Sequence, residues 1–399
     1  MHSEKSLSFP TLLMMISFAS VNAVLFTPGL PNIANFFDIT NKVAQYTLTW
    51  YLVGYAFGQL IYGPLANRFG RKPALYGGIF LQIGSSLLCV LSGFLESYSV
   101  LVLGRFLLAL GAGVGLKMTF TLVNECYPPK IAAQKISYLA LAFAISPGLS
   151  VALGGFLNAH FGWMSCFYAS AIYGIFLLLL TLRLPETRTQ VDYQALELKH
   201  LIQGYVRQFT NLDLLAGGIL MGFGGCFVYV FAAVAPFVAI SLMGMSSEGY
   251  GLANLLPSTG LAIGTLVCAQ LTKKYDLKTL ILIGISISLL GGILMLFATS
   301  AQYGALYALF IPTMVTYMGI SFILPSASSY AMSHTEDKAH GSAVMNFLNM
   351  GLSMLGVLSL GSFSIHLGLL PVYYICLSVL MGFVYYRMLS ERRLSSQVI

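Results

Sequence analysis

Long apolar stretches, each of about twenty residues, recur along the whole chain and constrain its fold more than any other feature. A helix of that length crosses a hydrocarbon core about 30 Å thick. Only 8% of the 399 residues are charged, whereas soluble domains carry roughly a quarter. The sequence therefore predicts an all-α membrane protein with twelve transmembrane helices, at roughly 11–33, 45–66, 73–94, 99–122, 135–158, 163–184, 213–240, 250–271, 278–299, 303–330, 342–363 and 370–390.

Positive charge is distributed unevenly over the loops between these spans. If the N-terminus is cytoplasmic, every Lys and Arg outside the spans faces the cytoplasm except Lys42. The positive-inside rule then places both termini in the cytoplasm, and we expect the protein in a bacterial inner membrane. This topology accounts for the formal net charge of +7. The sequence has no basic run interleaved with aromatic residues on a soluble domain, so we expect no nucleic-acid partner.

The chain divides near its middle. Residues 185–212 form the longest polar stretch, with six predicted spans on either side. We therefore interpret 1–184 and 213–399 as two six-helix domains joined by a cytoplasmic linker. A weak internal repeat supports this division. Shifted by 206 residues (271 minus 65), Leu65-Ala-Asn-Arg-Phe and Lys72 fall on Leu271-Thr-Lys-Lys-Tyr and Lys278.

A short loop between the second and third spans carries three cations in a turn rich in Gly and Pro, Gly63-Pro-Leu-Ala-Asn-Arg-Phe-Gly-Arg-Lys-Pro73. Its cations can bond to exposed helix-end carbonyls and to acidic partners of the other domain. Such contacts would hold one side of the protein shut until substrate shifts the balance. The predicted gating residues are Gly63, Asn67, Arg68, Gly70, Arg71 and Lys72. In the alternative interpretation, the cations only anchor the topology.

Two cations, Arg105 and Lys117, lie inside the fourth predicted span. They are separated by about 18 Å along the helix axis and by about 120° around it, so they do not share one stripe. Because a charge in the hydrocarbon is costly, both are functional candidates, and Lys117 is a candidate cavity cation that attracts an anionic group. The alternative for Lys117 is snorkelling toward the cytoplasm or a structural pair with Glu125, two turns further on.

The acidic residues all map to loops or span ends, and none lies at a span centre. A proton-coupled exporter of cationic drugs needs a buried carboxylate that can exchange a proton for its substrate. Arg105 and Glu125 therefore remain as candidates for coupling, although Glu125 also fits a solvated helix end. The six cysteines have no C-x-x-C spacing, and we expect neither a metal ion nor a cofactor.

The gating loop resembles the signature loop of the major facilitator superfamily, except that Asn67 replaces the aspartate of that pattern. Leu103-Gly-Arg-Phe and Ser146-Pro-Gly-Leu-Ser-Val-Ala-Leu-Gly-Gly155 add to the likeness, which is greatest to drug:proton antiporters of the bicyclomycin/chloramphenicol-resistance type. The resemblance implies two pseudo-symmetric six-helix bundles with the substrate site between them, and a role for Arg105 in proton exchange or cavity electrostatics. The first-span acid of that type aligns with Val24, so its cation site does not transfer to this chain.

Small residues in two spans indicate close helix packing. Pro147, Gly148, Gly154 and Gly155 make up the antiporter-type element of the fifth span. Because Pro permits a bend and Gly a close contact, we interpret this element as a packing seam. The G-x-G-x-G run that starts at Gly111 in the fourth span has the same interpretation.

Aromatic walls with a few polar points suit amphiphilic organic solutes. The predicted substrate-cavity wall comprises Asn22, Phe26, Tyr55, Gln59, Arg105, Lys117, Tyr229 and Tyr317.

We predict a monomeric secondary active transporter with a small organic substrate, the lipid bilayer as its surroundings and protons as candidate coupling ions. Efflux of drug-like or anionic amphiphilic compounds is the leading hypothesis. The alternatives are uptake of an anionic metabolite or siderophore, and a receptor-like homologue that does not transport. An enzyme is not expected, because no constellation of nucleophile, base and metal ligands is recognisable.

Overall fold

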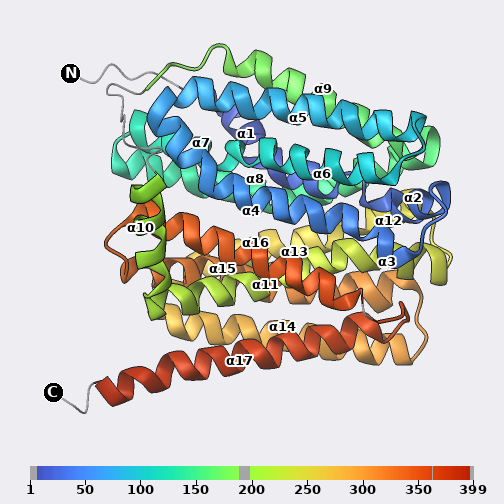
Figure 1. Cartoon of the computed structure of the whole chain (residues 1–399). Coiled ribbons are helices and arrows are strands. Elements are labelled where there is room, and N and C mark those ends of the chain that lie inside the picture. The colour runs from blue at the N-terminus through green and yellow to red at the C-terminus, as the bar shows by residue number, and fades with distance from the viewer. Residues whose placement is uncertain (1–6, 188–197, 362, 396–399) are drawn as a thin grey trace. The chain divides into compact units, whose positions relative to one another are not determined.

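A computed structural model describes residues 7–187, 198–361 and 363–395, and their regular secondary structure is entirely helical (Figure 1). Residues 188–197 of the predicted linker lie outside the described residues. The α-helices are α1 (Phe9–Val24), α2 (Leu30–Phe36), α3 (Asn41–Ala44), α4 (Tyr46–Phe69), α5 (Arg71–Phe94), α6 (Tyr98–Ala112), α7 (Val114–Cys126), α8 (Pro129–Phe161), α9 (Met164–Thr181), α10 (Leu198–Phe209), α11 (Leu212–Pro236), α12 (Ser247–Ala253), α13 (Leu255–Leu271), α14 (Leu277–Ser300), α15 (Ile311–Ser333), α16 (Lys338–Leu360) and α17 (Leu369–Ser395). A 3₁₀ helix, η1 (Thr27–Gly29), and two π-helical turns, η2 (Phe237–Leu242) and η3 (Leu306–Phe310), complete the set.

The described residues contain 11 helical segments that are long and apolar enough to cross a membrane. The remaining predicted span, at 45–66, corresponds to α4, which has 24 residues. Its tyrosines, Trp50 and Gln59 are less apolar than the residues of the other spans, which explains its lower hydropathy. The predicted all-α membrane fold is confirmed.

Contacts between Cα atoms divide the chain into two compact units, Met1–Ile202 with Ser246–Leu252 and Gln203–Met245 with Ala253–Ile399. In the first unit, α5 packs against α6 and α9, α4 against α6, and α1 against α8. The corresponding pairs recur in the second unit, where α14 packs against α15 and α17, α13 against α15, and α11 against α16. The two bundles therefore share one internal packing scheme, as the weak sequence repeat suggests.

Several spans are interrupted where proline or glycine occurs. The first span is broken at Pro28 within η1, between α1 and α2. The fourth span is broken at Gly113, between α6 and α7. Pro236 ends α11 immediately before the π-helical turn η2, and Pro312 follows η3. Since proline has no amide hydrogen to donate, the regular helical hydrogen-bond pattern changes beside it.

The three glycines of the fourth span face three different helices. A Cβ added at Gly111 would lie 2.6 Å from a carbonyl oxygen of α5, and one at Gly115 would lie 2.4 Å from a carbonyl oxygen of α1. At Gly113 the nearest atom would be Cα of Gly58 in α4, at 3.2 Å. Any side chain larger than hydrogen at these three positions would push the neighbouring helices apart. The predicted role of the three glycines in close helix packing is therefore confirmed.

Candidate functional site

The loop between α4 and α5 turns at one residue, Gly70. Its φ of 107° lies in the left-handed region, which side chains with a Cβ disfavour. A Cβ at this position would also lie 2.9 Å from Oε2 of Glu186. Glycine is therefore required on both grounds. The tight turn places Arg71 and Lys72 on the first turn of α5.

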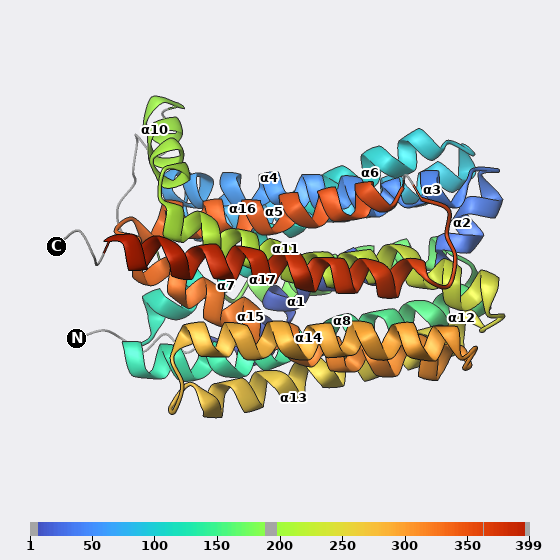
Figure 2. The ribbon, with the colours of Figure 1, turned by 90° about the horizontal axis from the view of Figure 1, so that it is seen from below.

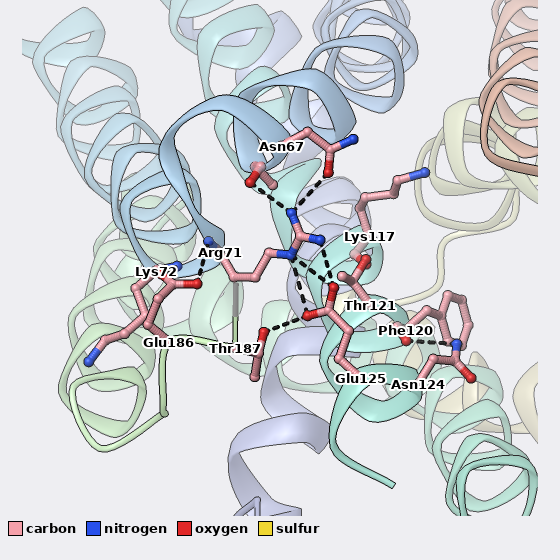
Figure 3. Close-up of polar contacts among 11 residues, drawn as sticks. Asn67, Arg71, Lys72, Lys117, Phe120, Thr121, Asn124, Glu125, Glu186 and Thr187 are labelled. Atoms are coloured by element: carbon pink, nitrogen blue, oxygen red, sulfur yellow. Dashed lines mark hydrogen bonds and ion pairs between the residues drawn. The ribbon is translucent and has the colours of Figure 1, made fainter. Parts of the chain in front are cut away.

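Arg71 is the centre of a polar cluster at the end of α4 (Figure 3). Its Nη2 atom pairs with Oε1 of Glu125 at 2.6 Å, and its Nε donates to the same oxygen at 3.2 Å. Its Nη1 donates to the carbonyl oxygen of Ala66 at 2.7 Å and to Oδ1 of Asn67 at 2.9 Å. The hydroxyl of Thr187 donates to Oε2 of Glu125. The carboxylate of Glu186 also accepts a hydrogen bond from the Arg71 backbone amide. We call these six residues the Arg71 cluster: Ala66, Asn67, Arg71, Glu125, Glu186 and Thr187.

Glu186 holds the beginning of α5. Its two carboxylate oxygens accept hydrogen bonds from the backbone amides of Arg71, at 3.0 Å, and Lys72, at 2.9 Å. A carboxylate is favourable there because the first amides of a helix lack partners within the helix and carry partial positive charge. Lys72 Nζ in turn donates to the carbonyl oxygen of Leu182 at 3.2 Å, just after α9. The start of α5 is thus tied to the segment that follows α9.

The partners of these cations bear on two of the expectations. In the described residues, the partners of the Arg71 guanidinium belong to the first unit. The expected contact of these cations with acidic partners of the other domain stays a prediction. Glu125 pairs with Arg71, so the alternative in which it pairs with Lys117 is wrong. Figure 3 shows the Lys117 side chain pointing away from Glu125. Arg68, the third cation of the loop, lies with Cζ 5.8 Å from the ring centroid of Phe69.

Arg105 is fully buried, with 1% of its surface exposed. Its Nη1 donates to the carbonyl oxygen of Asn22 at 2.8 Å and its Nη2 to that of Ala23 at 3.1 Å. These carbonyls lie in the last turn of α1, where the helix dipole is negative. The guanidinium carbon also lies 4.0 Å from the ring centroid of Phe26 and 4.4 Å from that of Tyr51. Backbone oxygens and aromatic faces therefore stabilise the Arg105 charge.

Lys117 lies half-buried on α7. A Cβ added at Gly63 would lie 3.6 Å from its Cε, so the lysine stem passes α4 at a glycine. Among the residues with described positions, no carboxylate forms an ion pair with the Lys117 ammonium. The predicted gating residue Gly63 and the predicted cavity cation Lys117 are thus neighbours within the first unit.

Asn22 takes part in a buried polar network between α1, α5 and α9. Its Oδ1 accepts hydrogen bonds from Gln82 Nε2, at 3.0 Å, and from the hydroxyl of Ser170. Gln82 also donates to the hydroxyl of Ser86 at 3.0 Å. Sequence reasoning assigned no role to Gln82 or Ser86, although two polar residues four positions apart on an apolar span are a usable signal. The Asn22 side-chain oxygen therefore joins three helices of one bundle, whereas its amide nitrogen donates to the Phe18 carbonyl oxygen within α1.

The other predicted wall residues fall in both units. In the first, Phe26 packs on Arg105, the ring of Tyr55 stacks on that of Tyr51 at 6.4 Å, and Gln59 is buried. In the second, the Tyr317 hydroxyl donates to a carbonyl oxygen of α11 at 3.5 Å. Tyr229 lies half-buried on α11. A shared cavity wall of these residues stays a prediction.

The two glycines of the antiporter-type element face different neighbours. A Cβ at Gly154 would lie 1.7 Å from the carbonyl oxygen that follows α1, and one at Gly155 would lie 2.5 Å from the carbonyl oxygen of Ser247. Ser247 belongs to the segment that groups with the first unit. Pro147 lies inside α8, and Gly148 is buried there. These contacts are those of a packing seam, and the element's role in transport stays a prediction.

Two helical units with one packing scheme, and an arginine-centred turn after the second span, are the arrangement expected of a helical membrane transporter. A family model, described as Major Facilitator Superfamily, matches residues 12–357. The chain belongs to this superfamily.

Relatives and solved structures agree with this assignment. An "Uncharacterized transporter" of Rickettsia felis is 27% identical over 332 residues, which cover 80% of each chain. The "Multidrug transporter MdfA" of Edwardsiella ictaluri is 25% identical over 359 residues, 89% of this chain and 86% of the relative. The crystal structure of a D-xylose-proton symporter matches with a TM-score of 0.78 at 17% identity, covering 95% of this chain and 96% of the symporter. At that identity the match shows the fold alone. The predicted resemblance to drug-transporting members is confirmed by the multidrug relative.

Proposed function

We propose that this chain is a secondary active transporter that exports drug-like or anionic amphiphilic compounds by alternating access. The observation that carries the proposal is Lys117, a half-buried cation inside a membrane span with no paired carboxylate among the described residues. An intramembrane charge is costly to keep, so it is retained where it interacts with a substrate or an ion. The multidrug name of one relative supports efflux.

The two intramembrane cations differ in their availability to a solute. Arg105 is enclosed by carbonyl oxygens and aromatic rings, with 1% of its surface exposed. Its proposed part is to fix the end of α1 and to make the electrostatic potential of the first bundle more positive. Lys117 is only half-buried and is the proposed contact for an anionic group of the substrate.

The Arg71 cluster is the proposed gating element. It joins the end of α4, the start of α5, the end of α7 and the segment after α9 into one connected group. Protonation of Glu125 would remove the counter-charge of Arg71 and loosen this group. Glu125 is therefore the proposed site at which a proton gradient acts, in place of a carboxylate at a span centre.

Flux measurements in proteoliposomes test the proposal. The native chain, Lys117→Ala and Lys117→Arg would be compared on anionic, neutral and cationic amphiphiles, with and without a pH gradient. Lys42→Ala, on the opposite predicted side, is the control for loss of a lysine. We expect anion flux to fall in Lys117→Ala and to persist in Lys117→Arg and Lys42→Ala. Rapid flux of an ethidium-like cation that Lys117→Ala leaves unchanged would contradict the proposal.

Uptake of an anionic metabolite or siderophore is the second candidate, because Lys117 would serve an inward-moving anion equally well. Accumulation rather than depletion of solute in expressing cells would favour it. Asn67 in the loop and the absence of an acid at the span centres favour a third candidate, a receptor-like homologue. Saturable binding without flux in proteoliposomes would support that candidate.

A further inference from the structure

Helix α10, between the two bundles in sequence, presents three chemically distinct faces. Ile202, Val206 and Phe209 recur with helical spacing, and their exposed fractions are 51%, 57% and 42%. Gln203 and Arg207 form a second, polar and exposed face. At about 100° per residue, the apolar face is centred about 120° from the polar one. Exposed apolar side chains gathered on one face are typical of a surface that contacts another protein or a membrane.

The third face of α10 is docked on the first turn of α16. A Cβ added at Gly204 would lie 2.6 Å from Nε2 of His340, so the His340 ring packs directly on the α10 backbone. The ring of Tyr205 contacts the same imidazole edge-on, with centroids 5.0 Å apart. Gln208, one turn further on, is buried. Burial here, with the nearby carboxylate of Asp337, raises the pKa of Tyr205 above its ordinary value. Contact with the described part of the protein therefore uses this face, and the apolar one stays exposed.

The polar face makes one ion pair at its edge. Nη2 of Arg207 lies 3.1 Å from Oε2 of Glu336, and both side chains are largely exposed, at 76% and 90%. Such an exposed pair contributes little to stability, and both of its charges are hydrated. The three faces of α10 thus correspond to three environments, namely protein, water and a third that suits apolar side chains.

The direction of α10 indicates what the third environment is. Both views show α10 running across the ends of α11 and α16, roughly perpendicular to their axes, as a helix lying along a membrane surface would (Figures 1 and 2). Only Thr210 and Asn211 separate α10 from Leu212, the first residue of the membrane span α11. Leu212 is itself 65% exposed. The apolar face of α10 is therefore continuous in sequence with an exposed apolar residue of a membrane-spanning helix.

We propose that Ile202, Val206 and Phe209 insert into the interfacial layer of the bilayer leaflet beside the start of α11. With the docked and apolar faces directed toward protein and lipid, the polar face with Gln203 and Arg207 points to the water. This is the arrangement of an interfacial amphipathic helix. Helix α10 thereby anchors the connection between the two bundles to the membrane surface and restricts its movement to the membrane plane.

Site-specific fluorescence with two kinds of quencher tests the proposal. A nitrobenzoxadiazole label would be placed on Val206→Cys, with Gln203→Cys as matched control, in full-length protein in which Cys126→Ser and Cys376→Ser remove the thiols that are not buried. The protein would be reconstituted into phosphatidylcholine vesicles, with brominated acyl chains as the lipid quencher and iodide as the aqueous one. We expect several-fold stronger quenching by brominated lipid at position 206 than at position 203, and the reverse order for iodide.

Two results would overturn the proposal. Equal iodide quenching at both positions would place the apolar face in water. Protection of position 206 from both quenchers would show that another part of this chain covers it. Phe209→Cys provides a second probe of the same face if the first variant elutes as an aggregate, and an unchanged far-UV circular dichroism spectrum verifies folding for each variant.

Discussion

The two bundles hold the start of their third spans in different ways. In the first, Gly70 turns with φ 107°, and the carboxylate of Glu186, which is 115 positions away, accepts from the amide of Arg71. In the second, Asp276 precedes α14 with an extended backbone, φ −72° and ψ 160°, and its own carboxylate accepts from the Thr279 hydroxyl. Both arrangements place negative charge at a helix N-terminus. The first depends on a long-range contact, and the second is local.

The contact between the third and fourth spans differs as well. In the first bundle it is the ion pair of Arg71 with Glu125, at 2.6 Å. In the second, Lys278 Nζ lies 5.7 Å from the ring centroid of Tyr330, whose hydroxyl donates to Asp213 at 2.5 Å. The second copy of the repeat therefore keeps the connection between helices but replaces the ion pair by a cation–π contact. Because an ion pair joins the two spans in the first bundle, their contact there should depend more on salt than the contact in the second bundle.

Removal of Arg71 has the largest expected effect. Arg71→Ala deletes the ion pair and two further hydrogen bonds and leaves Glu125 without its cation. Hydrogen bonds to charged groups contribute about 1.5–3 kcal/mol, so we expect the free energy of unfolding to fall by about 2 kcal/mol. Unfolding by SDS titration in detergent micelles would measure it. The matched variant Lys278→Ala loses one cation–π contact and should cost less than about 1 kcal/mol. Equal losses would abolish the distinction between the bundles.

Removal of the Glu186 carboxylate has the next largest effect. Glu186→Ala leaves the amides of Arg71 and Lys72 without their acceptor, a loss comparable to that of a helix cap, about 1 kcal/mol. Hydrogen exchange at these two amides should accelerate. Glu186→Gln keeps one acceptor oxygen and should give an intermediate result. Unchanged exchange in Glu186→Ala would mean that α5 does not depend on the long-range contact.

An aspartate introduced at position 67 gives a smaller change of opposite sign. Asn67 Oδ1 already accepts from Arg71 Nη1 at 2.9 Å, so Asn67→Asp adds charge without new geometry. We expect a gain of about 0.5 kcal/mol in the free energy of unfolding that shrinks with added salt. Asn67→Ala, which loses the acceptor, is the control. A destabilised Asn67→Asp would show that its carboxylate is repelled by Glu125 more than it is attracted to Arg71.

Helix positions could be predicted from sequence because apolar length is a local property. The α4 span was recognisable despite its tyrosines, whereas the start of α8 at Pro129 lies before the predicted 135 because Lys130 and Lys135 resemble a loop. The break at Gly113 was not predicted, since glycine within a membrane span is common.

The contacts of the candidate site could not be predicted from the sequence, because the partners of its arginines are distant in sequence or are backbone atoms. Glu125 lies 54 positions from Arg71, and no residue pattern links the two. Arg105 is held by carbonyls of Asn22 and Ala23, and any residue type carries a carbonyl. The loop motif indicated that Arg71 is important, but only the packing of α4, α5 and α7 shows its partner.

The smallest expected effect concerns the local arrangement at α14. The hydrogen bond from the Thr279 hydroxyl lowers the pKa of the Asp276 carboxyl. A lowered folded-state pKa stabilises the fold above the unfolded value of about 3.9, and this contribution is lost as the pH falls through the folded-state pKa. Because Asp276 is exposed, solvent screens the effect. Thr279→Val removes the hydroxyl at nearly constant shape. The Asp276 titration midpoint should then rise toward its ordinary value in a carboxyl NMR titration. The control is Thr272→Val, because the Thr272 hydroxyl donates to a backbone carbonyl and not to a carboxylate. If the midpoint does not move in Thr279→Val, the charge at α14 does not depend on its local partner, and the contrast with the long-range Glu186 contact is lost at this position.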